Sequence, residues 1–113
     1  MAKVSFSKLD AKINNSVTTI SFSNTKNEKV DIEVKNYLPI EEKIVVVMNV
    51  LNQSIDNNGY YNPLRINMYT ALEMIYAYTN LSFTAKQKDN IFKLYDQLKS
   101  SGVVDKVKSA VPS

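Results

Sequence analysis

The sequence predicts an α+β fold: a small antiparallel N-terminal sheet of two or three strands, followed by three main helices and a short C-terminal helix. In the strand-rich residues 1–38 apolar and polar residues alternate, whereas in the helical residues 39–111 apolar residues recur three and four positions apart. Strands that precede helices, rather than alternating with them, are typical of α+β folds. No Gly/Ser-rich or Pro-rich linker divides the chain, so residues 1–113 are predicted to form a single domain.

The clearest strand is predicted over residues 30–35, where every second residue is apolar and the residues between them are charged. A second strand is predicted over the β-branched residues 16–22. The polar residues 24–28 between them suit a hairpin loop. A third strand is predicted at the start of the chain, over residues 3–9.

A first helix is predicted to begin at Pro39, because proline suits the first helical position and Glu41 and Glu42 complement the positive end of the helix dipole. Its apolar residues recur at helical spacing: Ile40, Ile44, Val47, Met48, Leu51 and Ile55. Three more residues widen this stripe: Val45, Val46 and Val50. A stripe of this width predicts a helix covered on more than one side, by the sheet and by other helices or a partner.

Residues 54–64 have the composition of a loop, in which Gly59 can adopt a positive φ. Asn62 and Pro63 at its end have the order of an N-cap and a first helical residue, so a second helix is predicted to follow. The apolar face of that helix is predicted to consist of Leu64, Met68, Ala71, Leu72, Ile75 and Tyr78.

A third helix is predicted from the capping-box pattern of Thr84 and Gln87 to about residue 99, with Gly102 ending it in a left-handed conformation. A short helix over residues 103–110 follows, and one side of this C-terminal segment is apolar: Val103, Val104, Val107 and Val111. We expect that side to pack on the third helix or on another subunit, because a helix of about eight residues is marginal in water by itself. Pro112 is positioned to open a further helix.

The composition excludes several classes of function. The chain contains no His, Cys or Trp, which removes the usual zinc ligands, the thiol nucleophile and the imidazole base, so we expect a non-enzymatic protein without metal or cofactor. The net charge of +3 is spread along the chain and includes a single Arg, so nucleic-acid binding is not expected. No apolar window reaches 18 residues, so we expect a soluble protein that is not exported and does not bind a membrane.

Two acidic residues carry the remaining enzymatic hypothesis. Asp56 lies in a loop that lacks the alternating ligands and terminal Glu of an EF-hand, so the loop is better explained as a turn. Glu73 is the one acid within an apolar helix, and Arg65, Tyr69 and Tyr76 on neighbouring turns are its expected partners. A structural role is therefore favoured for both acids.

The seven tyrosines point to protein binding. Tyrosine and arginine are enriched at the centres of protein interfaces. Two tyrosines lie in the loop, and the other residues share a face of the second helix that is both aromatic and polar. The predicted interface residues are Tyr60, Tyr61, Arg65, Tyr69, Glu73 and Tyr76. The alternative for Tyr69 and Tyr76 is that they fill a small core that lacks tryptophan.

Four segments carry a family resemblance: residues 33–43, 58–64, 73–89 and 93–102. Together they resemble a group of small proteins encoded by tailed bacteriophages, and the match spans residues 30–111. The resemblance implies a head or tail accessory protein of the virion structure or assembly module, with no catalytic residue.

The resemblance also implies partners and a location. Its partners are phage structural proteins or further copies of the chain, in the host cytoplasm during infection and in the virion. The alternative function is a phage inhibitor that binds a host defence or replication protein.

Overall fold

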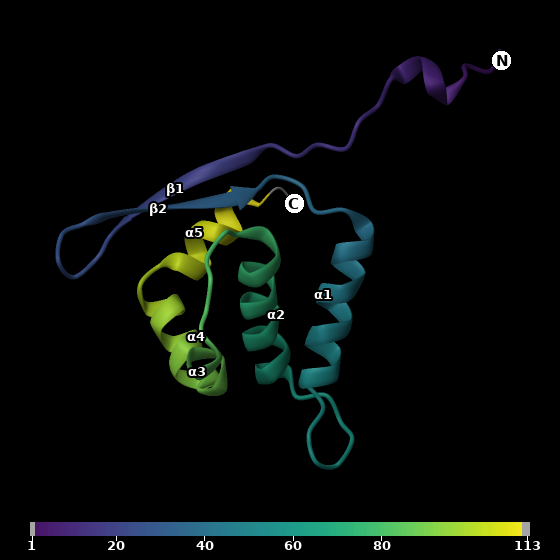
Figure 1. Cartoon of the computed structure of the whole chain (residues 1–113). Helices are drawn as coiled ribbons and strands as arrows, with labels where there is room; N and C mark the ends of the chain where they lie inside the picture. Colours follow the sequence, from purple (N-terminus) through teal and green to yellow (C-terminus); the bar gives the residue numbers. More distant parts are fainter. Residues whose placement is uncertain (1, 112–113) are drawn as a thin grey trace.

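The computed structural model describes residues 2–111 and has an α+β fold, as the sequence predicts (Figure 1). A two-stranded sheet lies across one end of a layer of helices. The elements follow in the order η1 (Phe6–Leu9), β1 (Val17–Ser23), β2 (Lys29–Lys35), α1 (Ile40–Gln53), α2 (Pro63–Tyr78), α3 (Ala85–Asp89), α4 (Ile91–Ser100) and α5 (Val103–Ala110).

The strands β1 and β2 form the predicted antiparallel hairpin. Ile20 lies opposite Ile32, so the apolar residues of both strands share one face. The Asn24 side chain closes the turn, because its Oδ1 accepts hydrogen bonds from the backbone N–H groups of Lys26 and Glu28, both at 2.9 Å. The alternating pattern therefore identified both strands and the buried face.

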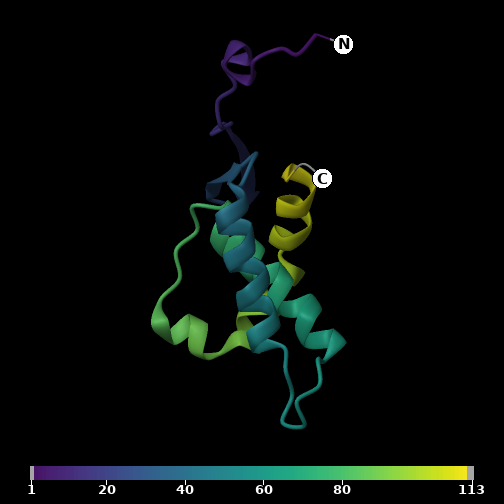
Figure 2. The same ribbon diagram turned by 90° about the vertical axis from the view of Figure 1, so that its right-hand side faces the viewer.

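The predicted strand over residues 3–9 is wrong. Residues 6–9 form the short 3-10 helix η1, and residues 2–16 extend away from the sheet (Figures 1 and 2). A strand requires a hydrogen-bonding partner, and in the described part of the chain the hairpin pairs within itself and, through Val34, with Thr79, but not with residues 3–9. We refer to residues 2–16 as the N-terminal arm; every residue in it is exposed.

Helix α1 begins directly after Pro39, with Glu41 and Glu42 in its first turn, as predicted. It packs chiefly against α2, and Val50 is its buried residue. The expectation that the sheet covers it is wrong, because the hairpin lies over α5 and ends before α1 (Figure 1). Most of its apolar side chains are consequently exposed.

The loop between α1 and α2 forms a narrow turn. Ile55 pairs with Tyr61 in a short antiparallel bridge, and Gly59 between them has a φ of 83°. Asn62 then caps α2, since its Oδ1 accepts hydrogen bonds from the backbone N–H groups of Leu64 and Arg65. The predicted turn, N-cap and N-terminal proline are all confirmed.

Asn62→Ala is expected to lower the free energy of unfolding by about 1 kcal/mol, because two backbone N–H groups of α2 lose their acceptor. Urea titration followed by circular dichroism measures the change. Asn67→Ala serves as the control, because Asn67 is exposed in the middle of the same helix. Equal stabilities for the two variants would contradict the capping role.

The core is built around the middle of α2. Its buried residues pack with Val34 of β2 and with the inner faces of α4 and α5: Met68, Ala71, Leu72, Ile75, Leu94, Leu98, Val103, Val104 and Val107. The predicted inner face of α2 is confirmed except at its start. Leu64 is 80% exposed, because the first turn of α2 extends beyond the neighbouring helices.

The predicted third helix is divided into two. Thr84 and Gln87 form the predicted capping box at the start of α3, but the helix breaks at Asn90, whose φ of −109° and ψ of 70° are not helical. Asp89 and Asn90 are weak helix formers, because their short polar side chains compete for the backbone. The chain leaves α4 at Gly102, which has the predicted left-handed conformation with a φ of 85°.

Helix α5 packs against α4, α2 and β1, which confirms that its apolar side is docked within the chain. Val104 and Val107 are almost completely buried there. The prediction for Pro112 lies outside the described residues.

The molecule is flat and extended, measuring 57 × 45 × 22 Å along its principal axes. Its radius of gyration is 17.5 Å, against about 13 Å for a compact domain of this length. Its accessible surface of 8630 Å² exceeds by roughly 2,300 Å² the surface expected for a folded monomer of this mass. The arm and the exposed side of α1 account for this shape.

Candidate protein-binding site

Helix α1 exposes a continuous apolar stripe, which we call the outer α1 face. Its members are between 38% and 63% exposed: Ile40, Ile44, Val47, Met48 and Leu51. In Figure 2 α1 stands in front, and no other element crosses it. Contiguous apolar surface of this kind marks an interaction site on a folded protein.

A groove of about 470 Å³ runs between α1 and α2, and we call it the α1–α2 groove. Its apolar wall is formed by Val45 and Val46 of α1 and by Ala77 of α2. Carboxylates line it as well, and no lysine or arginine does: Glu41, Glu42 and Glu73. The groove therefore combines an apolar surface with negative charge.

Glu73 joins the two helices that form this groove. Its Oε1 accepts a hydrogen bond from Gln53 Nε2 at 3.0 Å, and its Oε2 accepts one from Asn49 Nδ2 at 3.5 Å. The hydrogen bonds of Glu73 therefore come from amide donors on α1 and not from its own helix, whereas its charge acts on Tyr76, one of the predicted partners. The carboxylate holds α1 against α2, a structural role.

Tyr76 lies at the side of the groove and also packs against the core. Its ring meets Phe83 edge-on at 5.2 Å between centroids, and Lys88 Nζ lies 4.9 Å from its ring centroid. Burial raises the pKa of the Tyr76 hydroxyl, and the charges of Glu73 and Tyr69 raise it further. Tyr69 also packs against the core. Both tyrosines therefore contribute to the core, which was the alternative to an interface role.

The six predicted interface residues are spread along α2 and the turn that precedes it. Tyr60 and Tyr61 are 72% and 52% exposed in the turn between α1 and α2, and Arg65 is exposed in the first turn of α2. Along α2, Arg65 lies about 16 Å from Tyr76 at 1.5 Å per residue. Only Glu73 and Tyr76 line the groove.

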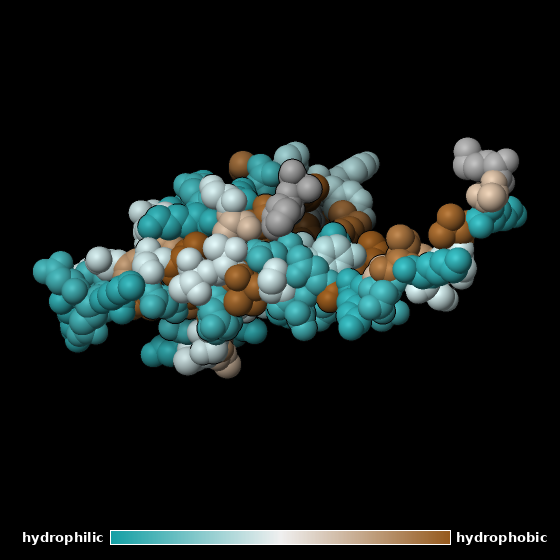
Figure 3. Space-filling view, turned by 90° about the horizontal axis from the view of Figure 1, so that it is seen from above, coloured by the Kyte–Doolittle hydropathy of each residue, from teal (hydrophilic) through white to brown (hydrophobic). Residues whose placement is uncertain are grey.

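The sequence predicted that a partner could cover part of the apolar stripe of α1, but it did not indicate the N-terminal arm as a candidate binding surface. The arm exposes four large apolar side chains, each between 67% and 74% accessible: Val4, Phe6, Leu9 and Ile13. Figure 3 shows apolar atoms along the arm and on the part of the body nearest to it. For the outer α1 face, the sequence signal was the width of the apolar stripe of α1.

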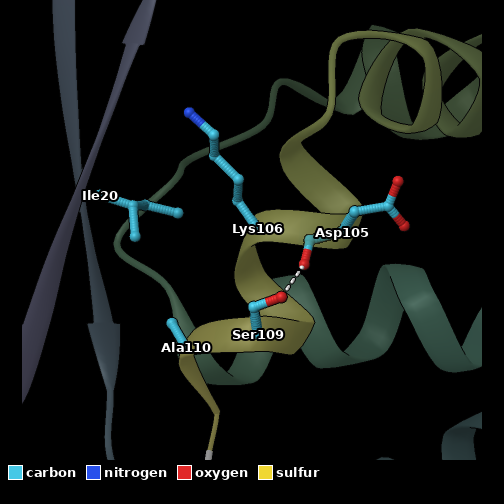
Figure 4. A pocket seen from close by; sticks show the side chains of 5 residues that line it. All are labelled: Ile20, Asp105, Lys106, Ser109 and Ala110. Atoms are coloured by element: carbon cyan, nitrogen blue, oxygen red, sulfur yellow. Dashed lines mark hydrogen bonds between the residues drawn. The ribbon is translucent and has the colours of Figure 1, made fainter.

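A second hollow, of about 410 Å³, lies between β1 and α5 (Figure 4). Lys106 is engaged there, because its Nζ donates a hydrogen bond to the Ser21 carbonyl at 3.1 Å and lies 4.6 Å from the Phe22 ring centroid. Ser109 Oγ donates to the carbonyl of Asp105 at 3.0 Å. The contacts of Lys106 connect α5 to β1, whereas the Ser109 hydrogen bond lies within α5.

The Asp56 loop is a turn, because the Asp56 carboxylate accepts hydrogen bonds from the backbone N–H groups of Asn58 and Tyr60. Across residues 2–111, no group of three acidic side chains is placed to hold a metal ion. None of the helices described is both long and apolar enough to cross a membrane. Comparison with protein-family models, curated proteins and solved structures finds no match to this chain.

Proposed function

We propose that this chain is a non-enzymatic protein-binding module of a phage particle, with a role in virion structure or assembly as a head or tail accessory protein. The outer α1 face carries the proposal, because a folded chain gains by covering such a surface with another protein. The absence of histidine and cysteine supports a non-enzymatic role. The phage context rests on the resemblance of residues 30–111.

Covering the outer α1 face contributes part of the free energy needed for association. Its five side chains are each about half exposed, so covering them stabilises a complex by on the order of 5 kcal/mol. Association costs about 4 kcal/mol or more in lost translational and rotational freedom. The outer α1 face therefore contributes the central contact of a complex, and further contacts must add to it.

Met48→Lys is expected to weaken association at least tenfold, because it places a charge in the centre of the outer α1 face. Light scattering after size exclusion, with and without purified phage structural proteins, measures the complexes formed. Asn67→Lys is the matched control, since it adds the same charge at an exposed polar position on α2, outside the outer α1 face. A strictly monomeric wild-type chain that binds no structural protein would contradict the proposal.

Infected cells separate this proposal from the alternative. A tagged chain is expected to be recovered in purified particles. An inhibitor of a host defence or replication protein would instead be recovered with that host protein and be missing from the particles. The second result would replace the assembly role by inhibition.

A further inference from the structure

We infer that the N-terminal arm of one copy binds in the α1–α2 groove of a second copy of this chain. The inference rests on the proposed protein-binding function and names the partner. It assigns a role both to the exposed N-terminal arm and to the acidic α1–α2 groove.

The arm carries apolar side chains that nothing covers in the single chain. Phe6 and Leu9 lie one turn apart in the 3-10 helix η1, and Ile13 follows in the non-helical segment after Asp10, whose φ is 47°. Each is more than 65% exposed. The arm therefore presents a narrow apolar side of the kind that helical segments insert into grooves.

The groove matches this segment in volume and polarity. Its 470 Å³ accommodates large side chains such as Phe6 and Leu9, and Val45, Val46 and Ala77 supply an apolar wall for them. A single chain leaves both surfaces in contact with water. Joining them removes apolar area from water on both sides.

The charges of the two surfaces are complementary. The arm contains three lysines and one aspartate: Lys3, Lys8, Lys12 and Asp10. The groove is lined by Glu41, Glu42 and Glu73. The nearby cation of α1, Lys43, is directed elsewhere, because its Nζ lies 5.1 Å from the centroid of the Tyr37 ring. Opposite charges around an apolar contact fix its register and raise the association rate.

Hydrogen bonds hold the end of the arm that joins β1, and they direct the arm away from the body. The Asn36 N–H donates to the Ser16 carbonyl at 3.0 Å, and Asn36 Nδ2 donates to Ser16 Oγ at 2.8 Å. The Ser16 N–H in turn donates to Asn14 Oδ1 at 2.9 Å. These bonds hold residues 14–16 in a direction that leads the arm away from the body, where a second copy can meet it (Figures 1 and 2).

The surface area agrees with a second copy as the partner. The chain exposes roughly 2,300 Å² more than a folded monomer of its mass, whereas each protein in an interface of standard size contributes about 800 Å². In a symmetric dimer each copy contributes one arm and one groove. Two reciprocal arm contacts give the dimer the additional area that the outer α1 face lacks.

The cysteine-free chain permits a direct test. A Ser7→Cys variant, with the thiol in the arm, is mixed under mild oxidation with a Val45→Cys variant that carries a different tag. We expect a disulfide-linked heterodimer in at least tenfold excess over the yield from Ser7→Cys mixed with Asn58→Cys, whose thiol lies in the turn between α1 and α2. Equal yields from the two mixtures would overturn the inference.

A chain that carries both Ser7→Cys and Val45→Cys tests the arm's own groove. A disulfide within the monomer, without cross-linked dimers, would overturn the inference in favour of an arm that folds back. Association that depends on Met48 but gives no arm-to-groove disulfide would also overturn it, while leaving the proposed function intact. If the chain neither forms the arm-to-groove disulfide nor associates with itself or with phage structural proteins, the proposed function is overturned as well.

Charge reversal adds a test that does not depend on cysteine chemistry. Glu42→Lys is expected to weaken self-association at least tenfold, because it places a lysine opposite the basic arm. Adding Lys8→Glu to that variant is expected to restore most of the loss. Self-association that is weakened further in the double variant would contradict the contact.

Discussion

Val107→Asp lowers the free energy of unfolding by roughly 3–5 kcal/mol, the largest effect expected from one substitution in this chain. Val107 is 1% exposed and packs in the core between α5 and α2. An aspartate there would be buried without a cation or hydrogen-bond donor to compensate for its lost hydration. A domain of this size has about 5–15 kcal/mol of stability in total, so thermal denaturation should show a large decrease in Tm.

Two substitutions on the same helix serve as controls. Ser109→Asp introduces the same carboxylate at an exposed position and is expected to change the stability by less than about 1 kcal/mol. Lys106→Ala is expected to have a similarly small effect, because Lys106 makes only an exposed hydrogen bond and a contact with Phe22. Equal, negligible effects of all three substitutions would show that α5 is not docked on the core.

Leu72→Ala should lower the free energy of unfolding by about 2–5 kcal/mol, because it leaves a cavity in the middle of the core. Leu72 is 1% exposed and lies at the centre of α2. Leu64→Ala makes the same chemical change on the same helix at a position that is 80% exposed. Its expected effect is below about 0.5 kcal/mol. Chemical denaturation measures both, and similar losses would contradict the different burial of the two leucines.

The features that the sequence predicted correctly depend on atoms close together along the chain. The N-cap at Asn62 and the capping box of Thr84 and Gln87 each join groups within three residues of one another. Gly102 is favoured in its left-handed conformation by its own lack of a Cβ atom. Such signals are complete in a short window of sequence, so tertiary contacts seldom override them.

Apart from the break at Asn90, the wrong predictions concern contacts between distant segments. The alternation of apolar and polar residues in the arm suggested a strand. That pattern does not reveal whether another strand is available to pair with it. The hydrogen bonds of Glu73 come from Asn49 and Gln53, more than 19 positions earlier, and no local pattern indicates them. The helical period of α1 identified its apolar residues without revealing which neighbour, if any, covers each one.

The candidate site was predictable only in part, for the same reason. Aromatic composition drew attention to Tyr60, in the turn before α2, and to Tyr76, in the last turn of α2. The groove instead depends on which side of α1 faces α2, and that is decided by the burial of Val50 and by the amide contacts of Glu73.

The packing of α5 on β1 affects the order in which the chain can become stable during synthesis. The hairpin leaves the ribosome early, yet Ile20 and Phe22 pack against a core that includes Val104 and Val107 from the far end of the described chain. A hairpin of two strands is marginal in water without that cover. During translation at about 5–20 residues per second, its apolar face therefore stays accessible to chaperones for several seconds until α5 has emerged.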